Sequence, residues 1–215
     1  VVSCHVPLTT EGANATHHLF DSRALEELTA TAEQKILLNA SRGSVVCEQA
    51  LLSVLRRGKP LQGAFDVWEH EPQTNAELIA LLSLATPHIA GHSFAGKLGG
   101  SWQLLKKWLT DQRLALQLPS FQRFLQSYPE GQAISQLAPQ APDWRTLCEW
   151  VLQIYDIRKD DQLLRHAARQ PEAFDALRRD YAVRAELSQL HLQAGEWAHT
   201  PYWQQCLSQL TFQID

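Results

Sequence analysis

The sequence predicts an α/β protein built on a parallel sheet, followed by a smaller region of α+β character. Two observations lead to this prediction. From Val1 to about His92, short apolar runs of strand length alternate with amphipathic segments of helix length. Beyond Pro119 this alternation stops, and an apolar stripe at helical spacing returns only near Trp144. Strands that alternate with helices are typical of parallel βαβ units.

The first elements follow from local signals. The run VVSCHVPLT is rich in β-branched residues and predicts a buried strand. Asp21 then predicts the N-cap of a helix over SRALEELTA. KILLNAS predicts the next strand, and CEQALLSVLRRG predicts the next helix, with arginines in its last turn.

The stretch from Leu61 to Ser93 delivers an acid and a histidine from the ends of two predicted strands. GAFDVW predicts a strand that breaks into an acidic turn with Glu71, and SLATPHIAG predicts a strand that leads to His88. Both side chains would leave the same edge of a parallel sheet. A carboxylate beside an imidazole holds one tautomer and favours the protonated ring, which suits general acid/base chemistry. On spacing alone, a structural histidine and a solvated turn are the commoner explanation.

Arg42 adds a third group, because it follows another apolar run at a position equivalent to the other two. Its guanidinium is a planar fork of donors that suits a carboxylate. The segments NASRGSVV, AFDVWEHEP and ATPHIAG, in this order, resemble the signature blocks of the NAD-dependent D-2-hydroxyacid dehydrogenases.

Three further segments narrow the resemblance within that family. They are GHSFAGKLGG, IYDIRKDD and FDALRRDYAVRAELSQL, and they resemble the members that act on a 4-phosphorylated hydroxy acid in pyridoxal phosphate biosynthesis. The resemblance runs from Val1 to about Leu192. It implies the second half of a Rossmann-like NAD-binding domain, followed by a smaller α+β dimerisation domain. The expected ranges are 1–92 for the NAD-binding part with the catalytic residues, 93–118 for a crossover helix and the return to the substrate-binding region, and 119–215 for the dimerisation domain.

The resemblance also implies roles for single residues. Arg42 would bind the substrate carboxylate, His88 would exchange a proton with the substrate hydroxyl, and Glu71 would orient and charge the imidazole. The residues that would contact NAD are Thr9, Ala40, Ser41, Arg42, Asp66 and Gly91. Without the resemblance, Asp66 is equally typical of a turn former at the end of a strand.

His92 stands where family members carry a tyrosine that contacts substrate, so we expect it to reach the substrate phosphate; a loop histidine that faces solvent is the alternative. His88 and His92 have the spacing of a metal pair on a helix, but Pro87 and Gly91 disfavour a helix there, so we expect no metal site. Three other histidines lack a partner motif and are expected on the surface or in loops: His5, His17 and His18.

The bulk properties exclude several classes. The chain has 215 residues, 45% hydrophobic content and a formal net charge of -4, so neither nucleic acid nor a membrane surface is an expected partner. The four cysteines are far apart, which fits reduced thiols in a cytoplasmic protein better than a disulfide or zinc framework. The sequence contains no Met and no GxGxxG. We therefore expect a C-terminal fragment that lacks part of the active site and is inactive by itself.

The remaining elements are expected as follows. Residues 94–111 predict a packing helix, LALQLP predicts a short strand, and the proline-punctuated stretch 119–142 predicts a loop and boundary. Beyond Trp144 a helical stripe, a QLHLQ strand and a helix capped by Thr200 follow.

The resemblance implies that residues 144–215 form a homodimer interface. Two other functions stay open: an NAD-dependent D-2-hydroxyacid dehydrogenase with another substrate, and a non-catalytic dimerisation or regulatory protein of the same fold.

Overall fold

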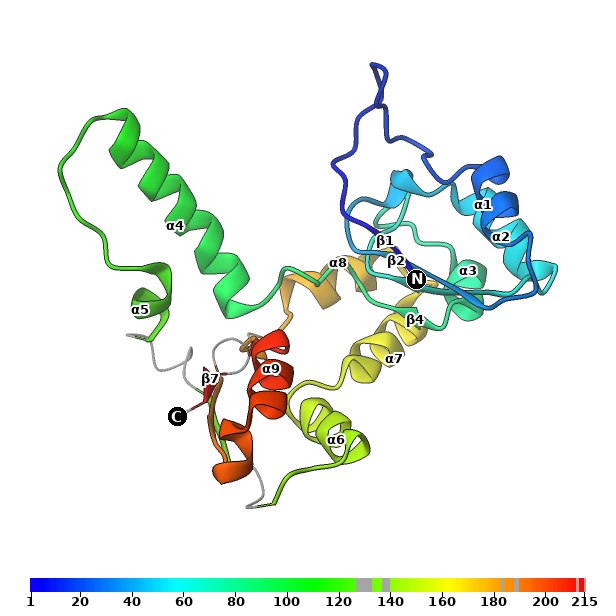
Figure 1. The fold of residues 1–215 in the computed structure, drawn as a ribbon. Coiled ribbons are helices and arrows are strands. Elements are labelled where there is room, and N and C mark those ends of the chain that lie inside the picture. The colour runs from blue at the N-terminus through cyan, green and yellow to red at the C-terminus, as the bar shows by residue number, and fades with distance from the viewer. Residues whose placement is uncertain (127–132, 137–139, 183, 188–189, 212, 215) are drawn as a thin grey trace. The chain divides into compact units, whose positions relative to one another are not determined.

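The computed structural model describes residues 1–126, 133–136, 140–182, 184–187, 190–211 and 213–214 (Figure 1). The chain divides into two compact units. The first contains Val1–Ala90 and Tyr155–Tyr181, and the second contains Gly91–Ile154 and Ala182–Asp215.

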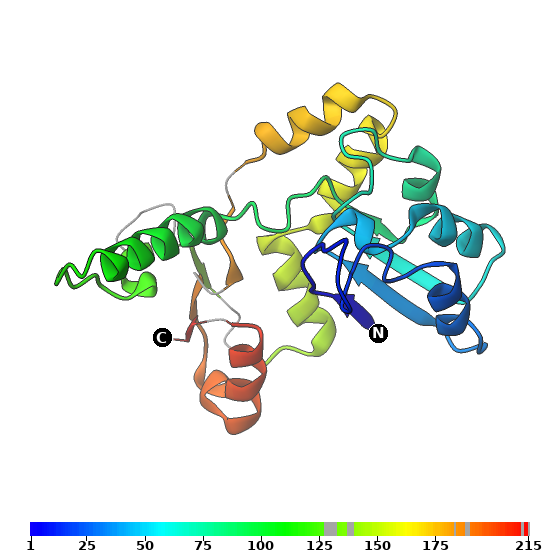
Figure 2. The ribbon, with the colours of Figure 1, turned by 90° about the horizontal axis from the view of Figure 1, so that it is seen from above.

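A four-stranded parallel sheet forms the centre of the first unit (Figure 2). Its strands lie in the order β1 (Val2–Cys4), β2 (Lys35–Asn39), β3 (Leu61–Phe65) and β4 (Leu84–Ala85). Every neighbouring pair is parallel. The predicted parallel α/β architecture is therefore confirmed, and the carboxyl ends of all four strands lie at one edge of the sheet.

The helices of the first unit begin and end where local chemistry requires. They are α1 (Ser22–Leu28), the 3-10 helix η1 (Gly43–Val45), α2 (Glu48–Arg56), α3 (Ala76–Leu81), α7 (Ile157–Ala167) and α8 (Pro171–Arg179). Asp21 caps α1 as predicted, because its side chain accepts a hydrogen bond from the Ala24 N–H at 2.9 Å. After α2 the chain turns at Gly58 with a φ of 64°, a left-handed conformation that glycine adopts without strain.

The core of the first unit contains side chains from the sheet and from both parts of the chain. Leu37 of β2, Leu51 of α2 and Leu78 of α3 are fully buried. Leu164 of α7 and Phe174 of α8 are buried in the same cluster. Because apolar burial is the main source of stability, these two side chains tie residues 155–181 to the sheet.

Polar contacts also attach α7 to β4. The Ala85 N–H at the sheet edge donates to Asp161 at 2.8 Å, which satisfies a strand amide. Arg165 pairs with Asp161 at 2.7 Å and donates to the carbonyl oxygens of Ile79 and Leu82 at 2.5 and 2.9 Å. The sequence prediction assigned this segment to one C-terminal range, 119–215. The structure packs residues 155–181 with the first unit instead.

The second unit combines helices with a small sheet. Its elements are α4 (Phe94–Asp111), α5 (Phe121–Gln126), β5 (Ala133–Gln136), α6 (Trp144–Ile154), β6 (Leu190–Gln193), the 3-10 helix η4 (Glu196–His199), α9 (Pro201–Gln209) and β7 (Gln213–Ile214). The strands are parallel in the order β5-β6-β7. Leu147, Ala198 and Leu207 form a buried core against which Trp150, Trp197 and Trp203 pack. The α+β character predicted for this region is present.

Several details of the second unit differ from the prediction. The predicted helix over 94–111 is confirmed. LALQLP forms no strand; Leu114 and Leu116 in it are 49% and 64% exposed, so burial gives a strand no support there. The stretch 119–142 is not only loop, because α5 packs Phe124 against Trp102 with ring centroids 4.5 Å apart. No helix among the described residues is long and apolar enough to cross a membrane.

Candidate active site

The candidate site lies in the first unit, at the carboxyl edge of its sheet. Arg42 follows β2, Glu71 follows β3, and His88 follows β4. In an open parallel sheet the loops beyond the carboxyl ends of the strands are the usual place for ligands. The sequence predicted this placement from the order of strands and loops.

His88 and Glu71 form the ion pair at the centre of the site. His88 Nδ1 lies 2.8 Å from Glu71 Oε2, and the two side chains are 32% and 20% exposed. The other carboxylate oxygen of Glu71 accepts a hydrogen bond from the Trp68 N–H at 2.8 Å. Because an ionised carboxylate only accepts hydrogen bonds, Nδ1 must carry a proton, and Nε2 is the atom that can exchange one with a substrate.

The backbone at His88 is shaped to present the ring. His88 has a φ of 57°, an uncommon left-handed conformation for a residue other than glycine. Such conformations cost roughly 1–3 kcal/mol and persist where the surroundings hold them in place. Here the His88 N–H donates to the Thr86 carbonyl at 3.1 Å, and the Trp68 indole donates to the same carbonyl at 3.1 Å.

Asp66 holds the loop that carries His88. Its buried carboxylate accepts hydrogen bonds from the Thr86 hydroxyl at 2.6 Å, the Ile89 N–H at 2.8 Å and the Ala90 N–H at 2.9 Å. Two of these bonds reach Oδ1 and one reaches Oδ2. A carboxylate has about four acceptor directions, so Asp66 retains one direction, on Oδ2, for a further donor.

Asn39 builds the turn that presents Arg42. The buried Asn39 side chain donates to the Arg42 carbonyl at 3.0 Å and accepts from the Ser41 N–H and hydroxyl at 3.2 and 2.9 Å. The Arg42 guanidinium remains exposed and donates to the Ser41 carbonyl at 2.7 Å. The charge of Arg42 is thus on the surface of the sheet edge, where an anion can reach it.

Gly43 brings this turn against the segment that follows β3. A Cβ at Gly43 would lie 2.0 Å from the carbonyl carbon and oxygen of Trp68 and 2.5 Å from the Glu69 nitrogen. Only glycine permits so close an approach of two backbones. The loops that carry Arg42 and Glu71 are therefore in direct contact.

The other predicted site residues are placed as follows. Thr9 is exposed in the loop after β1, where its N–H donates to the buried Thr16 hydroxyl at 2.8 Å. Ala40 is exposed and Ser41 is half-buried in the turn after β2. Gly91 and His92 belong to the second unit, in which Gly91 is exposed and His92 is half-buried. The predicted roles of these residues remain predictions.

The buried Glu48 and the half-buried Glu69 stand beside the site and were missed from the sequence. The Glu48 N–H donates to Glu69 Oε2 at 3.1 Å, and the Glu69 N–H donates to Glu48 Oε1 at 2.8 Å. Burial raises the pKa of Glu48 above its usual range, and the nearby Glu69 charge adds to this effect. Burial also acts to raise the pKa of Glu69, but hydrogen bonds from His18 and from the Glu48 backbone outweigh it and lower that pKa.

The arrangement can bind a carboxylate and move a proton. Arg42 offers a guanidinium fork, and His88 offers a nitrogen whose charged state is supported by Glu71. The sequence predicted all three groups, and it named Asp66 for contact with NAD rather than for holding the His88 loop. It did not predict the two residues that fix the Arg42 turn, Asn39 and Gly43. The Asn-Ala-Ser run was a local signal for the turn at Asn39, because asparagine often closes a turn with its side chain.

Two protein-family models and several curated proteins match this chain. Residues 1–90 match the family model of the D-isomer specific 2-hydroxyacid dehydrogenase NAD-binding domain, and residues 129–210 match a domain of unknown function (DUF3410). The chain is 40% identical over 198 residues to an erythronate-4-phosphate dehydrogenase of Pectobacterium carotovorum, with 89% of this chain and 49% of that protein covered.

One more curated protein and one solved structure are similar to this chain. An erythronate-4-phosphate dehydrogenase of Aeromonas salmonicida is 38% identical over 216 residues, with 100% of this chain and 53% of that protein covered. The chain thus spans about half the length of the curated relatives it matches. A D-mandelate dehydrogenase structure from Rhodotorula graminis is 34% identical, with 42% of this chain and 24% of that chain covered and a TM-score of 0.35. The resemblance stated from the sequence is confirmed.

Proposed function

We propose that the full-length protein is an NAD-dependent dehydrogenase of a 2-hydroxy acid, because residues 1–90 match the family model of the D-isomer specific 2-hydroxyacid dehydrogenase NAD-binding domain. Its proposed substrate is 4-phospho-D-erythronate, and its product is 3-hydroxy-2-oxo-4-phosphooxybutanoate, in pyridoxal phosphate biosynthesis. The observation that carries the chemistry is the His88–Glu71 pair, at 2.8 Å, on the same sheet edge as Arg42. The similarity to erythronate-4-phosphate dehydrogenases supports the choice of substrate.

Arg42 binds the acid in this proposal. The exposed guanidinium pairs with the substrate carboxylate and donates to the hydroxyl oxygen on the neighbouring carbon. The Asn39 hydrogen bonds hold the turn, so Arg42 is positioned before the substrate arrives. His92 is proposed to donate to the substrate phosphate, for which an imidazole is suited because it can be a charged donor near neutral pH.

His88 moves the proton. As the substrate is oxidised, His88 Nε2 accepts the hydroxyl proton and the ring becomes an imidazolium. Glu71 stabilises that charge across the 2.8 Å hydrogen bond to Nδ1 and keeps the ring in one orientation. Asp66 acts through the loop, because its three hydrogen bonds keep His88 in the left-handed conformation. In the reverse direction the charged His88 returns its proton to the 2-oxo group.

The residues at the sheet edge fit a nicotinamide cofactor. Asp66 keeps one acceptor direction for an amide N–H, and the exposed Ala40 and half-buried Ser41 are small enough to allow a flat ring to approach. The residues proposed to hold NAD are Thr9, Ala40, Ser41, Arg42, Asp66 and Gly91. When bound, NAD accepts the hydride that leaves the substrate carbon.

We also propose that residues 144–215 contribute to a homodimer. In the second unit, Trp144 of α6 and Tyr202 of α9 are 56% and 55% exposed. Both rings pack beside Trp203, with centroids 6.2 and 5.3 Å from it. Exposed aromatic side chains that are held in a cluster are typical anchors of protein interfaces.

An assay of the full-length protein tests the proposed reaction. Purified protein is incubated with NAD and 4-phospho-D-erythronate, and in parallel with D-glycerate or D-lactate, while NADH absorbance is followed. We expect turnover with the phosphorylated acid and a much lower kcat/KM for the other two. Equal or higher kcat/KM with D-glycerate or D-lactate would assign the protein to another substrate. No turnover with any of the three acids would contradict the proposal and favour a non-catalytic role.

A further inference from the structure

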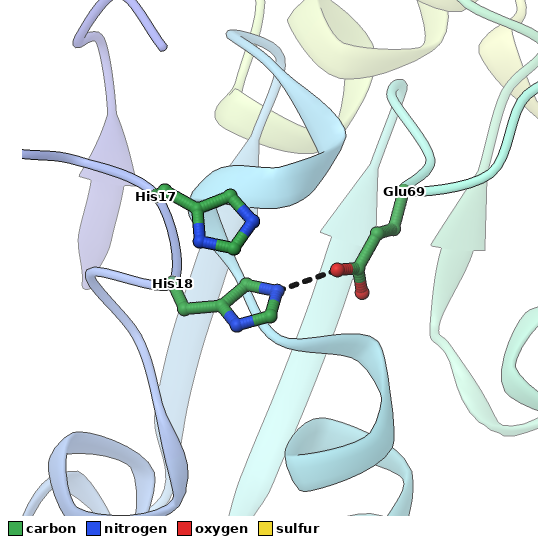
Figure 3. Close-up of side chains that lie close together, drawn as sticks. All are labelled: His17, His18 and Glu69. Carbon is green, nitrogen blue, oxygen red and sulfur yellow. Dashed lines mark hydrogen bonds and ion pairs between the residues drawn. The ribbon is translucent and has the colours of Figure 1, made fainter. Parts of the chain in front are cut away.

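Three side chains of types that bind transition metals meet beside the candidate active site. His17 and His18 lie in the loop between β1 and α1, and Glu69 follows β3 (Figure 3). One potential ligand atom from each residue lies within 4.8 Å of those from the other two. The three residues are not among those assigned to substrate or NAD above.

The backbone conformation at His18 brings the two histidines together. Side chains of adjacent residues in an extended chain point in opposite directions. His18 instead has a φ of 52°, and its N–H donates to the Ser44 carbonyl at 2.7 Å. As a result the two rings stack with centroids 3.9 Å apart and an interplanar angle of 25°, and both stand on the side of Glu69 (Figure 3).

The carboxylate of Glu69 is oriented by a partner of its own. Its Oε2 accepts from the Glu48 N–H at 3.1 Å, while its Oε1 points to His18 Nε2 at 2.5 Å. The Glu69 and His18 side chains are 11% and 32% exposed, and His17 is exposed. The arrangement is thus a held carboxylate with two imidazoles on its solvent side, which gives an ion a path from solvent.

From this geometry we propose that His17, His18 and Glu69 bind a divalent cation of the zinc class. Two imidazole nitrogens and one carboxylate oxygen are ligands that zinc accepts, and the fourth position of a tetrahedral ion is then open to water. The hydrogen bond from Glu48 supplies the outer-shell contact that orients a metal-binding carboxylate. This proposal does not depend on dehydrogenase activity.

Metal binding replaces the hydrogen bond between His18 and Glu69. Zinc–ligand distances near 2.1 Å at a tetrahedral angle separate two ligand atoms by about 3.4 Å. His18 Nε2 and Glu69 Oε1 must therefore move apart by about 1 Å, which the half-exposed His18 ring allows. The ion takes the place of the hydrogen-bonding proton between them.

The site connects two loops of the candidate active site. Glu69 is two residues before Glu71, and Glu69 N is 2.5 Å from the position of a Cβ on Gly43, next to Arg42. An ion held by His17, His18 and Glu69 therefore ties the loop after β1 to the segment that carries Glu71. Anything that binds only the folded state also raises its apparent stability.

Zinc titration of the untagged full-length protein tests the site. Isothermal titration calorimetry with Zn²⁺ near neutral pH should show one ion bound per chain. His17→Ala should weaken the zinc affinity at least tenfold, because it removes one of three protein ligands. His70→Ala is the matched control, since His70 is exposed beside Glu69 but is not one of the three ligands; its affinity should equal that of the parent. The metal-free melting temperature of both variants should equal that of the parent.

Other outcomes would overturn the proposal. They are no binding of zinc at millimolar concentration, a loss of less than tenfold in His17→Ala, and an equal loss in His70→Ala. Unweakened binding in His17→Ala would mean that zinc occupies another place, such as the His88–Glu71 pair. Co²⁺ gives a second readout, because the visible absorption of the bound ion reports imidazole coordination. This absorption should be absent when Co²⁺ is added to His17→Ala. Neither readout requires turnover, so failure of the proposed reaction would leave this test intact.

Discussion

Gly43 allows a direct test of the contact between the Arg42 turn and the Glu71 segment. In Gly43→Ala the new Cβ would lie 2.0 Å from the carbonyl carbon and oxygen of Trp68. Carbon atoms in contact prefer about 3.5 to 4.0 Å, so the two turns would have to separate by roughly 1.5 Å. Both partners are backbone, so a side-chain rotation cannot relieve the clash.

The expected effect is large in stability and in activity. Overpacking costs typically 1–3 kcal/mol, and we expect about 3 kcal/mol because backbone meets backbone. A shift of about 1 Å in catalytic groups can cost about 100-fold, and we expect that loss in kcat/KM. The free energy of unfolding is measured in urea, and kcat/KM is measured from NADH absorbance with the full-length protein.

A control separates this contact from a general effect of replacing glycine. Gly100→Ala in α4 adds a Cβ that meets nothing within 4 Å. It should increase stability by up to about 1 kcal/mol and leave kcat/KM unchanged, because alanine favours a helix over glycine. If Gly43→Ala stayed within about 0.5 kcal/mol of the parent and within threefold of its kcat/KM, the reasoning from this contact would be refuted.

Three further predictions concern single side chains. Asp66→Asn places an amide N–H₂ against the Ala90 N–H, so urea unfolding should show a loss of about 1–3 kcal/mol, with reduced turnover. Glu48→Gln should be more stable than the parent near pH 7.5 and equal to it below about pH 4. The raised pKa of Glu48 means that folding favours the neutral form of this side chain. The parent therefore loses stability as the pH rises through the folded pKa, whereas the glutamine variant does not. Trp144→Ala should weaken self-association about 30-fold in light scattering over a concentration series, as an exposed aromatic anchor would.

Each of these has an outcome that would contradict it. An Asp66→Asn protein of parental stability would mean that the loop does not depend on its carboxylate. A Glu48→Gln protein less stable than the parent at neutral pH would mean that the Glu48 charge is favourable in the folded state. A parental dimer affinity in Trp144→Ala would remove α6 from the interface.

The first unit was largely predictable because its signals are local. Asp21 caps the following helix through a residue three positions away, and β3 and β4 end directly before the polar residues Asp66 and Thr86. The His88–Glu71 contact joins residues 17 positions apart, yet it follows from two parallel strands that end at the same edge. For such pairs the topology brings the residues together, and the sequence reveals the topology.

Contacts between residues that lie far apart in the sequence could not be predicted in this way. Glu69 meets His18 across 51 positions and Glu48 across 21, and no periodicity or motif indicates either contact. The packing of residues 155–181 on the sheet depends on Asp161, which accepts from an amide 76 positions away. LALQLP has the alternation of a strand, but Leu114 and Leu116 are 49% and 64% exposed, and propensity without burial does not make a strand.

Proton transfer by His88 in the proposed reaction is tested most directly by His88→Gln in the full-length protein, with turnover measured at saturating 4-phospho-D-erythronate and NAD affinity measured by titration. We predict a loss of turnover of roughly 10²- to 10⁴-fold with little change in NAD affinity, as expected for removal of a general acid/base. A loss of less than about tenfold, in a variant whose chemical step is shown to limit the rate, would contradict the claim.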